Sequence, residues 1–122
     1  MAVETEGTLI VRRTVRAILL LQQGTFKTKD LALRLGISVR DTQRLIQGLK
    51  EAGVLFEKKR RGEHQLRSDS PLYDVQTVTY GGGGGMGMLY TTREYSLTSY
   101  GKRIFVNLFG ERAKEAENML NF

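Results

Sequence analysis

The sequence of 122 residues contains no cysteine, one histidine and one proline. Without cysteine the chain can form neither disulfides nor thiolate metal sites, which fits an intracellular protein. The single histidine, His64, has no cysteine or second histidine with which to share a metal ion, so a surface or phosphate-facing position is favoured over ligation. We therefore expect no metal and no cofactor.

Long apolar runs are missing as well. The most apolar stretch, residues 17–21, is much shorter than the roughly 20 residues needed to cross a bilayer. Arginines precede it, as in a signal peptide, but no small-residue cleavage pattern follows Leu21. The sequence predicts a cytoplasmic protein without a membrane partner.

Patterns typical of catalysis are also missing. The carboxylates are scattered singly among basic residues, with no apolar pocket to separate an acid from a base. The glycine run 81–85 invites comparison with a phosphate-binding loop, but that loop has Lys and Ser or Thr directly after its last glycine, and here Gly87 precedes Met88. A hairpin loop, a disordered tip or an engineered linker explains the run better. We predict that the chain is not an enzyme and expect no small-molecule effector.

Positive charge is concentrated in one part of the chain. Residues 1–70 contain 14 Lys and Arg against 8 Asp and Glu, whereas residues 71–122 contain 5 of each class. The net charge of +6 therefore belongs to the first part. Basic segments attract polyanions, so nucleic acid or an anionic membrane leads the candidate partners, with a merely solubilising surface as the alternative.

Three helices are expected in this basic part. Apolar periodicity predicts the first over residues 9–23. Thr28 is interpreted as the N-cap of a second helix over residues 29–35, and Ser38 as the N-cap of a third that ends near Ala52. Because so short a turn separates the second and third helices, they must cross steeply, as in a helix-turn-helix.

The third expected helix has two contrasting sides. One side groups Thr42, Leu45, Ile46 and Leu49. The other side carries long hydrogen-bond donors at helical spacing, with no glutamate among them: Arg40, Gln43, Arg44 and Gln47. Such side chains read base edges in a major groove, so we predict base contacts from these four and from Val39. A solvated face is the alternative, and Arg44 is also suited to a phosphate.

A basic hairpin tip is expected after the third helix. The apolar run 54–56 leads into four consecutive cations, and alternation resumes at Gln65. Together with the starts of the second and third helices, this tip is predicted to bind phosphates. The predicted phosphate contacts are Thr28, Lys29, Ser38, Lys58, Lys59, Arg60 and Arg61. A solubilising charge cluster is the alternative.

The neutral part of the chain predicts strands followed by one helix. Alternation from Tyr73 to Thr79 and over residues 88–97 predicts two strands on either side of the glycine run. A last helix over residues 99–120 follows. Its apolar side is too large for so small a domain to cover, so a dimer contact is predicted for Phe105, Leu108, Phe109, Met119 and Leu120. The alternative is that this helix only closes the core of the monomer.

Residues 28–44, continuing through 49–54, resemble the helix-turn-helix of DeoR-like regulators and of the N-terminal module of WYL-domain regulators. The register holds without a gap, with Asp41 in place of the usual Thr. That difference weakens a phosphate contact from position 41 but not the fold, because an acid there still favours the start of a helix. The resemblance implies DNA binding, and with no WYL domain following, it implies no ligand sensing.

A shorter segment, residues 95–102, is similar to the last wing strand and following helix of MarR-like and PadR-like repressors. In that case residues 54–57 would pair with residues 93–97, and the chain between them would be one enlarged wing. Two successive hairpins are equally compatible with the pattern.

The sequence as a whole predicts a mainly helical α+β fold in one domain. Its expected parts are a winged helix-turn-helix core (8–70), a hairpin with a glycine-rich loop (71–98) and a C-terminal helix for dimerisation (99–122). The expected function is that of a homodimeric, sequence-specific double-stranded-DNA-binding transcription regulator, with repression as the commoner mode. The alternatives are a winged-helix protein-interaction module and a nonspecific nucleic-acid binder.

Overall fold

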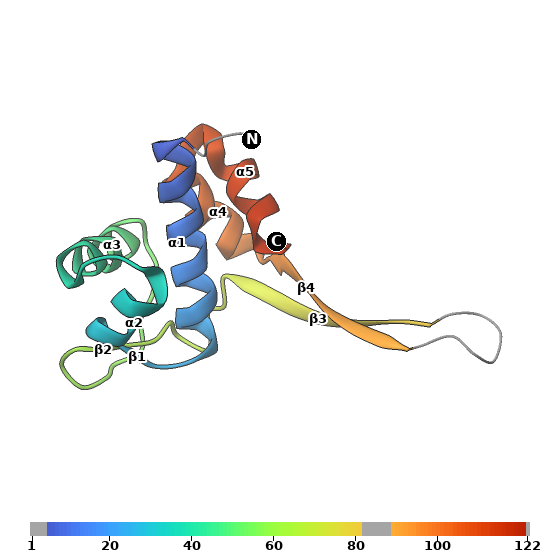
Figure 1. Cartoon of the computed structure of the whole chain (residues 1–122), viewed down its shortest axis with the longest axis horizontal. Helices are drawn as coiled ribbons and strands as arrows, with labels where there is room; N and C mark the ends of the chain where they lie inside the picture. The colour runs from blue at the N-terminus through green and yellow to red at the C-terminus, as the bar shows by residue number, and fades with distance from the viewer. Residues whose placement is uncertain (1–4, 82–88, 122) are drawn as a thin grey trace.

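The computed structural model describes residues 5–81 and 89–121. The fold is α+β and mainly helical, with two small antiparallel sheets among the described residues. In chain order the elements are α1 (Glu6–Gln23), β1 (Phe26–Lys27), α2 (Thr28–Leu35), α3 (Val39–Glu51), β2 (Glu63–His64), β3 (Tyr73–Tyr80), β4 (Tyr90–Leu97), α4 (Ser99–Phe109), η1 (Gly110–Arg112), α5 (Ala113–Asn118) and η2 (Met119–Asn121). Helix α1 runs through the body of the molecule, between α2 and α3 on one side and α4 and α5 on the other (Figure 1).

The three predicted N-terminal helices are present and begin and end close to the expected residues. Ser38 is the N-cap of α3, as predicted, and its hydroxyl accepts a hydrogen bond from the Asp41 N–H at 3.0 Å. Helix α2 ends at Gly36, whose φ of 68° lies in the left-handed region that glycine tolerates. Helix α1 begins earlier than predicted, at Glu6, because Thr5 caps it.

The first hairpin, residues 54–67, carries the basic tip. Its two sides are joined by backbone bonds from Glu57 to Gln65 and from Arg67 to Leu55, at 2.8 and 3.0 Å. Beyond them, His64 pairs with Phe26 of β1, a two-residue strand that the sequence analysis did not predict. The chain before α2 thus joins the first hairpin in one small sheet.

The second hairpin consists of β3 and β4, which pair antiparallel from Tyr73 opposite Leu97 to Tyr80 opposite Tyr90. Two successive hairpins are therefore present, and the alternative of one long wing is wrong. The expected strand over residues 88–97 begins at Tyr90, and most of the glycine run lies outside the described residues. The second hairpin projects from the body as a long arm (Figure 1).

The C-terminal segment is not the single helix that was predicted over residues 99–120. It is broken at Gly110, whose φ of 55° and ψ of −121° end α4, and the chain turns through η1 into α5. The broken segment folds back so that α5 and η2 pack against α1, while α4 packs against α5 (Figure 1). This break was not predicted, because the apolar spacing continues on both sides of Gly110.

One apolar core joins the helices to the bases of both hairpins. The largest fully buried side chains are Tyr73, Phe105, Ile18, Leu21, Leu31, Leu49, Leu66, Leu72, Leu120 and Val15, with Thr42. The buried Thr42 hydroxyl donates to the Ser38 carbonyl at 2.9 Å, so this polar group is satisfied. No helix in the described part of the chain has the length and apolar character needed to cross a membrane.

Candidate nucleic-acid interface

Helix α3 is anchored by one side and exposed on the other. Thr42, Ile46 and Leu49 are buried and Leu45 is half-buried against the core, which confirms the predicted inner side. The four predicted donors on the opposite side are all exposed, and we call them the α3 stripe: Arg40, Gln43, Arg44 and Gln47. Val39, at the start of the helix, is 44% exposed. The stripe therefore stands free of the core that holds the helix in place.

Within the α3 stripe the side chains have only weak partners. The Arg44 guanidinium lies 3.7 Å from the Asp41 carboxylate, with both side chains largely exposed. The Gln47 amide donates to Glu51 at 3.4 Å. Exposed pairs of this kind contribute little free energy, so a ligand can take over these donors at small cost.

The cations Lys58, Lys59, Arg60 and Arg61, which we call the basic loop, are all exposed. The loop is fastened to the start of α2, because the Thr28 N–H donates to the Gly62 carbonyl at 3.1 Å. This bond brings Arg60 and Arg61 beside Lys29, around a hollow of about 520 Å³. With four cations lining it and only Glu63 opposing them, the hollow is suited to an anion.

The interpretation of Thr28 as the N-cap of the second helix is wrong. Thr28 is the first residue of α2 and not its N-cap, since the N-cap position is Lys27, which makes no side-chain cap. Its hydroxyl lies 2.8 Å from His64 Nε2 and 3.5 Å from the Gly62 carbonyl oxygen. The hydroxyl thus connects α2 to the first hairpin and helps to position the basic loop, and its contact with a phosphate stays a prediction.

His64 shares this junction between β2 and α2. Partial burial, and secondarily the positive charge of Lys50, lowers the pKa of its imidazole below the ordinary 6.5. The ring is therefore neutral at pH 7. Depending on its tautomer, it accepts a hydrogen bond from the Thr28 hydroxyl or donates one to it.

Two cations that the sequence analysis did not assign border the predicted site. Lys27 completes the lining of the hollow beside the basic loop. Arg13 of α1 lines a second hollow, of about 370 Å³, together with Arg44 of α3. Sequence spacing could not link Arg13 to Arg44, because that proximity depends on how α1 packs against α3.

The predicted dimer contact requires correction. Phe105, Met119 and Leu120 are 1%, 8% and 2% exposed and belong to the protomer's own core, while Leu108 and Phe109 pack partly against it. The break at Gly110 allows α4 and α5 to pack on each other and α5 to pack on α1, so that the apolar sides of both helices join one core. These three core side chains therefore have no surface to offer a partner.

The described residues include no group of three or more side chains suited to hold a metal ion. Comparison with protein-family models, with curated proteins and with solved structures found no match. The case for a function therefore depends on the geometry of this surface.

Proposed function

We propose that this chain is a sequence-specific double-stranded-DNA-binding regulator of transcription, built on a winged helix-turn-helix. The observation that carries the proposal is the α3 stripe, four exposed donors opposite the buried side of a helix that is anchored in the core. Helix α3 and the first hairpin lie on the same side of α1 (Figure 1), so one duplex can contact both.

In the proposed complex α3 enters the major groove. Arg40 and Arg44 supply guanidinium groups that match the two acceptors of guanine, and Gln43 supplies an amide that matches adenine. Val39 is placed at the first turn, where an apolar side chain can contact a thymine methyl group. Discrimination between sequences would come from these side chains.

Phosphate contacts would come from the basic loop and from the starts of α2 and α3. Lys29 and Arg61 line one hollow, and backbone N–H groups at the start of each helix favour anions near them. The Ser38 hydroxyl accepts its capping bond and keeps its own hydrogen for a phosphate oxygen. These contacts supply affinity and register without sequence preference.

Selection of binding sites from a random duplex library tests the proposal. We expect a short enriched motif, because the α3 stripe carries donors that distinguish bases. Salt-sensitive binding without enrichment would leave only a nonspecific nucleic-acid binder. Absence of binding to any duplex at low salt would overturn the proposal and favour a protein-interaction module.

A further inference from the structure

The second hairpin extends beyond anything in the body that could cover it. Its base is held by Tyr73 and Leu97, both buried, but from Val75 onward most side chains on both faces are exposed. Val75 is 49% exposed and Tyr80 42%. An isolated two-stranded hairpin is only marginally stable in water, so an arm of this length is suited to pair with something else.

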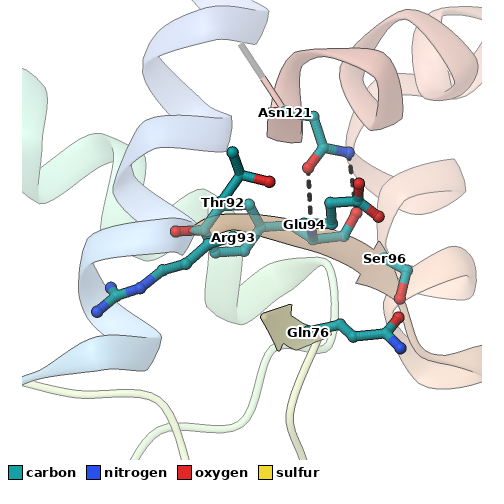
Figure 2. Close-up of a pocket in the computed structure, with 7 residues that line it drawn as sticks. Gln76, Thr92, Arg93, Glu94, Ser96 and Asn121 are labelled. Carbon is teal, nitrogen blue, oxygen red and sulfur yellow. Dashed lines mark hydrogen bonds between the residues drawn. The ribbon is translucent and has the colours of Figure 1, made fainter. Parts of the chain in front are cut away.

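Two side-chain amides from the body occupy the outer edges of the arm at its base. On β3, the Gln22 amide donates to the Tyr73 carbonyl at 2.7 Å and accepts from the Tyr73 N–H at 3.3 Å. On β4, the Asn121 amide accepts from the Tyr95 N–H at 2.7 Å and donates to the Tyr95 carbonyl at 3.0 Å (Figure 2). Each amide takes the place that a peptide group of a third strand would occupy.

These bonds show which peptide groups of β3 point outward. In an antiparallel pair the outward groups recur at every second residue, so those of Val75, Thr77 and Thr79 follow that of Tyr73. Within residues 5–81 and 89–121, no hydrogen bond joins these three outward groups to another residue. The outer edge of β3 beyond Gln22 is therefore free to accept a strand.

This edge lacks the charges that usually prevent strands from pairing. The six residues from Val75 to Tyr80 are uncharged and are mostly Val, Thr and Tyr, which favour strands. The β4 edge differs, because it carries Arg93 and Glu94 and is shared with Asn121 beside a polar hollow of about 450 Å³ (Figure 2). Of the two edges, that of β3 is the better suited to pairing.

We propose that the outer edge of β3 pairs antiparallel with the same edge of a second copy of this chain. The edge is complementary to itself. When Thr77 lies opposite the partner's Thr77, Val75 lies opposite the partner's Thr79, and all three outward peptide groups on each side have a partner. About six hydrogen bonds would form. Gln22 blocks pairing at Tyr73, so a shifted register would leave outward groups unmatched.

The partner is protein, and not nucleic acid, because the arm lacks an excess of cations. Its described residues carry Asp74, Arg93 and Glu94, a net charge of about −1, whereas phosphate contacts require Lys or Arg in excess. The paired arms would form a four-stranded sheet with one body at each end. This inference does not depend on DNA binding, and its test contains no DNA.

Cysteine cross-linking tests the proposed register directly, because the natural chain has no cysteine. Two opposed residues that exchange both hydrogen bonds across an antiparallel pair have Cα atoms about 5.5 Å apart. That distance lies within the range of about 4.4–6.8 Å that a disulfide spans. We expect Thr77→Cys to form a disulfide-linked dimer under mild oxidation. Thr91→Cys is the matched control, since Thr91 is exposed on the β4 edge, at a position whose peptide group also points outward.

Light scattering after size-exclusion chromatography gives the second readout. We expect a dimer mass for the unmodified chain and for Thr91→Lys. We expect a monomer mass for Thr77→Lys, because this change would place two ammonium groups opposite each other. Circular dichroism on each variant checks that the body remains folded. A monomeric natural chain, a dimer that Thr77→Lys leaves intact, or equal cross-linking of the two cysteine variants would overturn the proposal.

Discussion

His64 connects the first hairpin to α2 through Thr28, and its state of charge therefore affects stability. Its pKa is lowered, first by burial and then by Lys50, so the folded protein holds the ring neutral in a range where the unfolded chain binds a proton. The stability that this provides is fully present above pH 6.5, the ordinary value, and is lost as the pH falls through 6.5 toward the lowered pKa.

We predict that the free energy of unfolding in urea declines between about pH 7.5 and about pH 5.5, and that His64→Gln reduces this decline. Glutamine keeps a polar group near Thr28 but does not titrate. Asp69 does not affect this comparison. The hydrogen bond from Arg67 lowers its pKa from 3.8, so any contribution of Asp69 to stability is lost only in more acidic solution. Identical pH profiles for the two proteins would contradict this role.

Gln22 is the second residue whose side chain joins two parts of the fold. Its carbonyl oxygen also accepts from the Leu72 N–H at 2.8 Å, so Gln22→Ala leaves three peptide groups at the base of β3 without a partner. We predict a loss of about 1–3 kcal/mol in the free energy of unfolding.

Gln23→Ala is the matched control for Gln22→Ala, because it makes the same change in the same turn of α1. Among the described residues, the Gln23 amide makes one hydrogen bond, to the Tyr73 hydroxyl at 3.2 Å, and Gln23 is exposed. Chemical denaturation of both variants gives the comparison, and equal losses would show that helix propensity, and not the bond to β3, governs the result.

At the scale of elements, the start of α4 is packed against the backbone that enters β3. A Cβ at Gly101 would lie 1.9 Å from the Leu72 carbonyl oxygen, a contact that flexible side chains cannot relieve. Gly101→Ala should therefore destabilise the protein by about 1–3 kcal/mol or more, whereas Gly48→Ala, in open space within α3, should stabilise it by about 0.5–1 kcal/mol. Thermal melts of the two variants check the opposite signs.

The α3 stripe gives a prediction that depends on the proposed function. Gln43→Ala removes an exposed amide without disturbing the buried side of α3, so it should weaken binding to a selected duplex by about 1–3 kcal/mol and leave binding to random duplex nearly unchanged. Fluorescence anisotropy with both duplexes measures this. If both affinities fall equally, Gln43 positions the helix and does not read a base.

Local patterns predicted the helices α1 to α3 and the strands β3 and β4, because capping, apolar spacing and alternation are encoded within each segment. Strand β1 was missed, since two residues carry no periodicity and pair only because α2 and the first hairpin meet there. The broken C-terminal helix was also missed. Its apolar residues were assigned to a partner because the sequence does not show that the turn at Gly110 lets them cover α1.

Over the whole molecule, the division of charge along the chain is also a division in space. The basic loop and α3 lie on one side of α1 and the nearly neutral second hairpin projects on the other (Figure 1). The charge count along the chain already indicated this division. The sequence could not show that Lys27 and Arg13 join the basic side, because each approaches its neighbours only through tertiary packing.

This arrangement predicts which cations would set the salt dependence of the proposed DNA binding. Replacing Arg60 and Arg61 by Gln should reduce the slope of log affinity against log salt by up to about 0.9 per lost phosphate contact. Replacing Arg93 and Lys114, which are exposed on the second hairpin and α5, removes the same charge and should leave the slope nearly unchanged. Titrations at several salt concentrations decide, and equal slopes for the two double variants would mean that only net charge matters.

The amide of Asn121 has a consequence for how long a preparation stays intact. Hydrolysis of that amide would release ammonia and leave a carboxylate, which still accepts from the Tyr95 N–H but repels the Tyr95 carbonyl oxygen. One of the two bonds on the outer edge of β4 would thus be lost, for a mass increase of about one dalton. Such a loss during storage would loosen the hold of the C-terminal segment on the second hairpin.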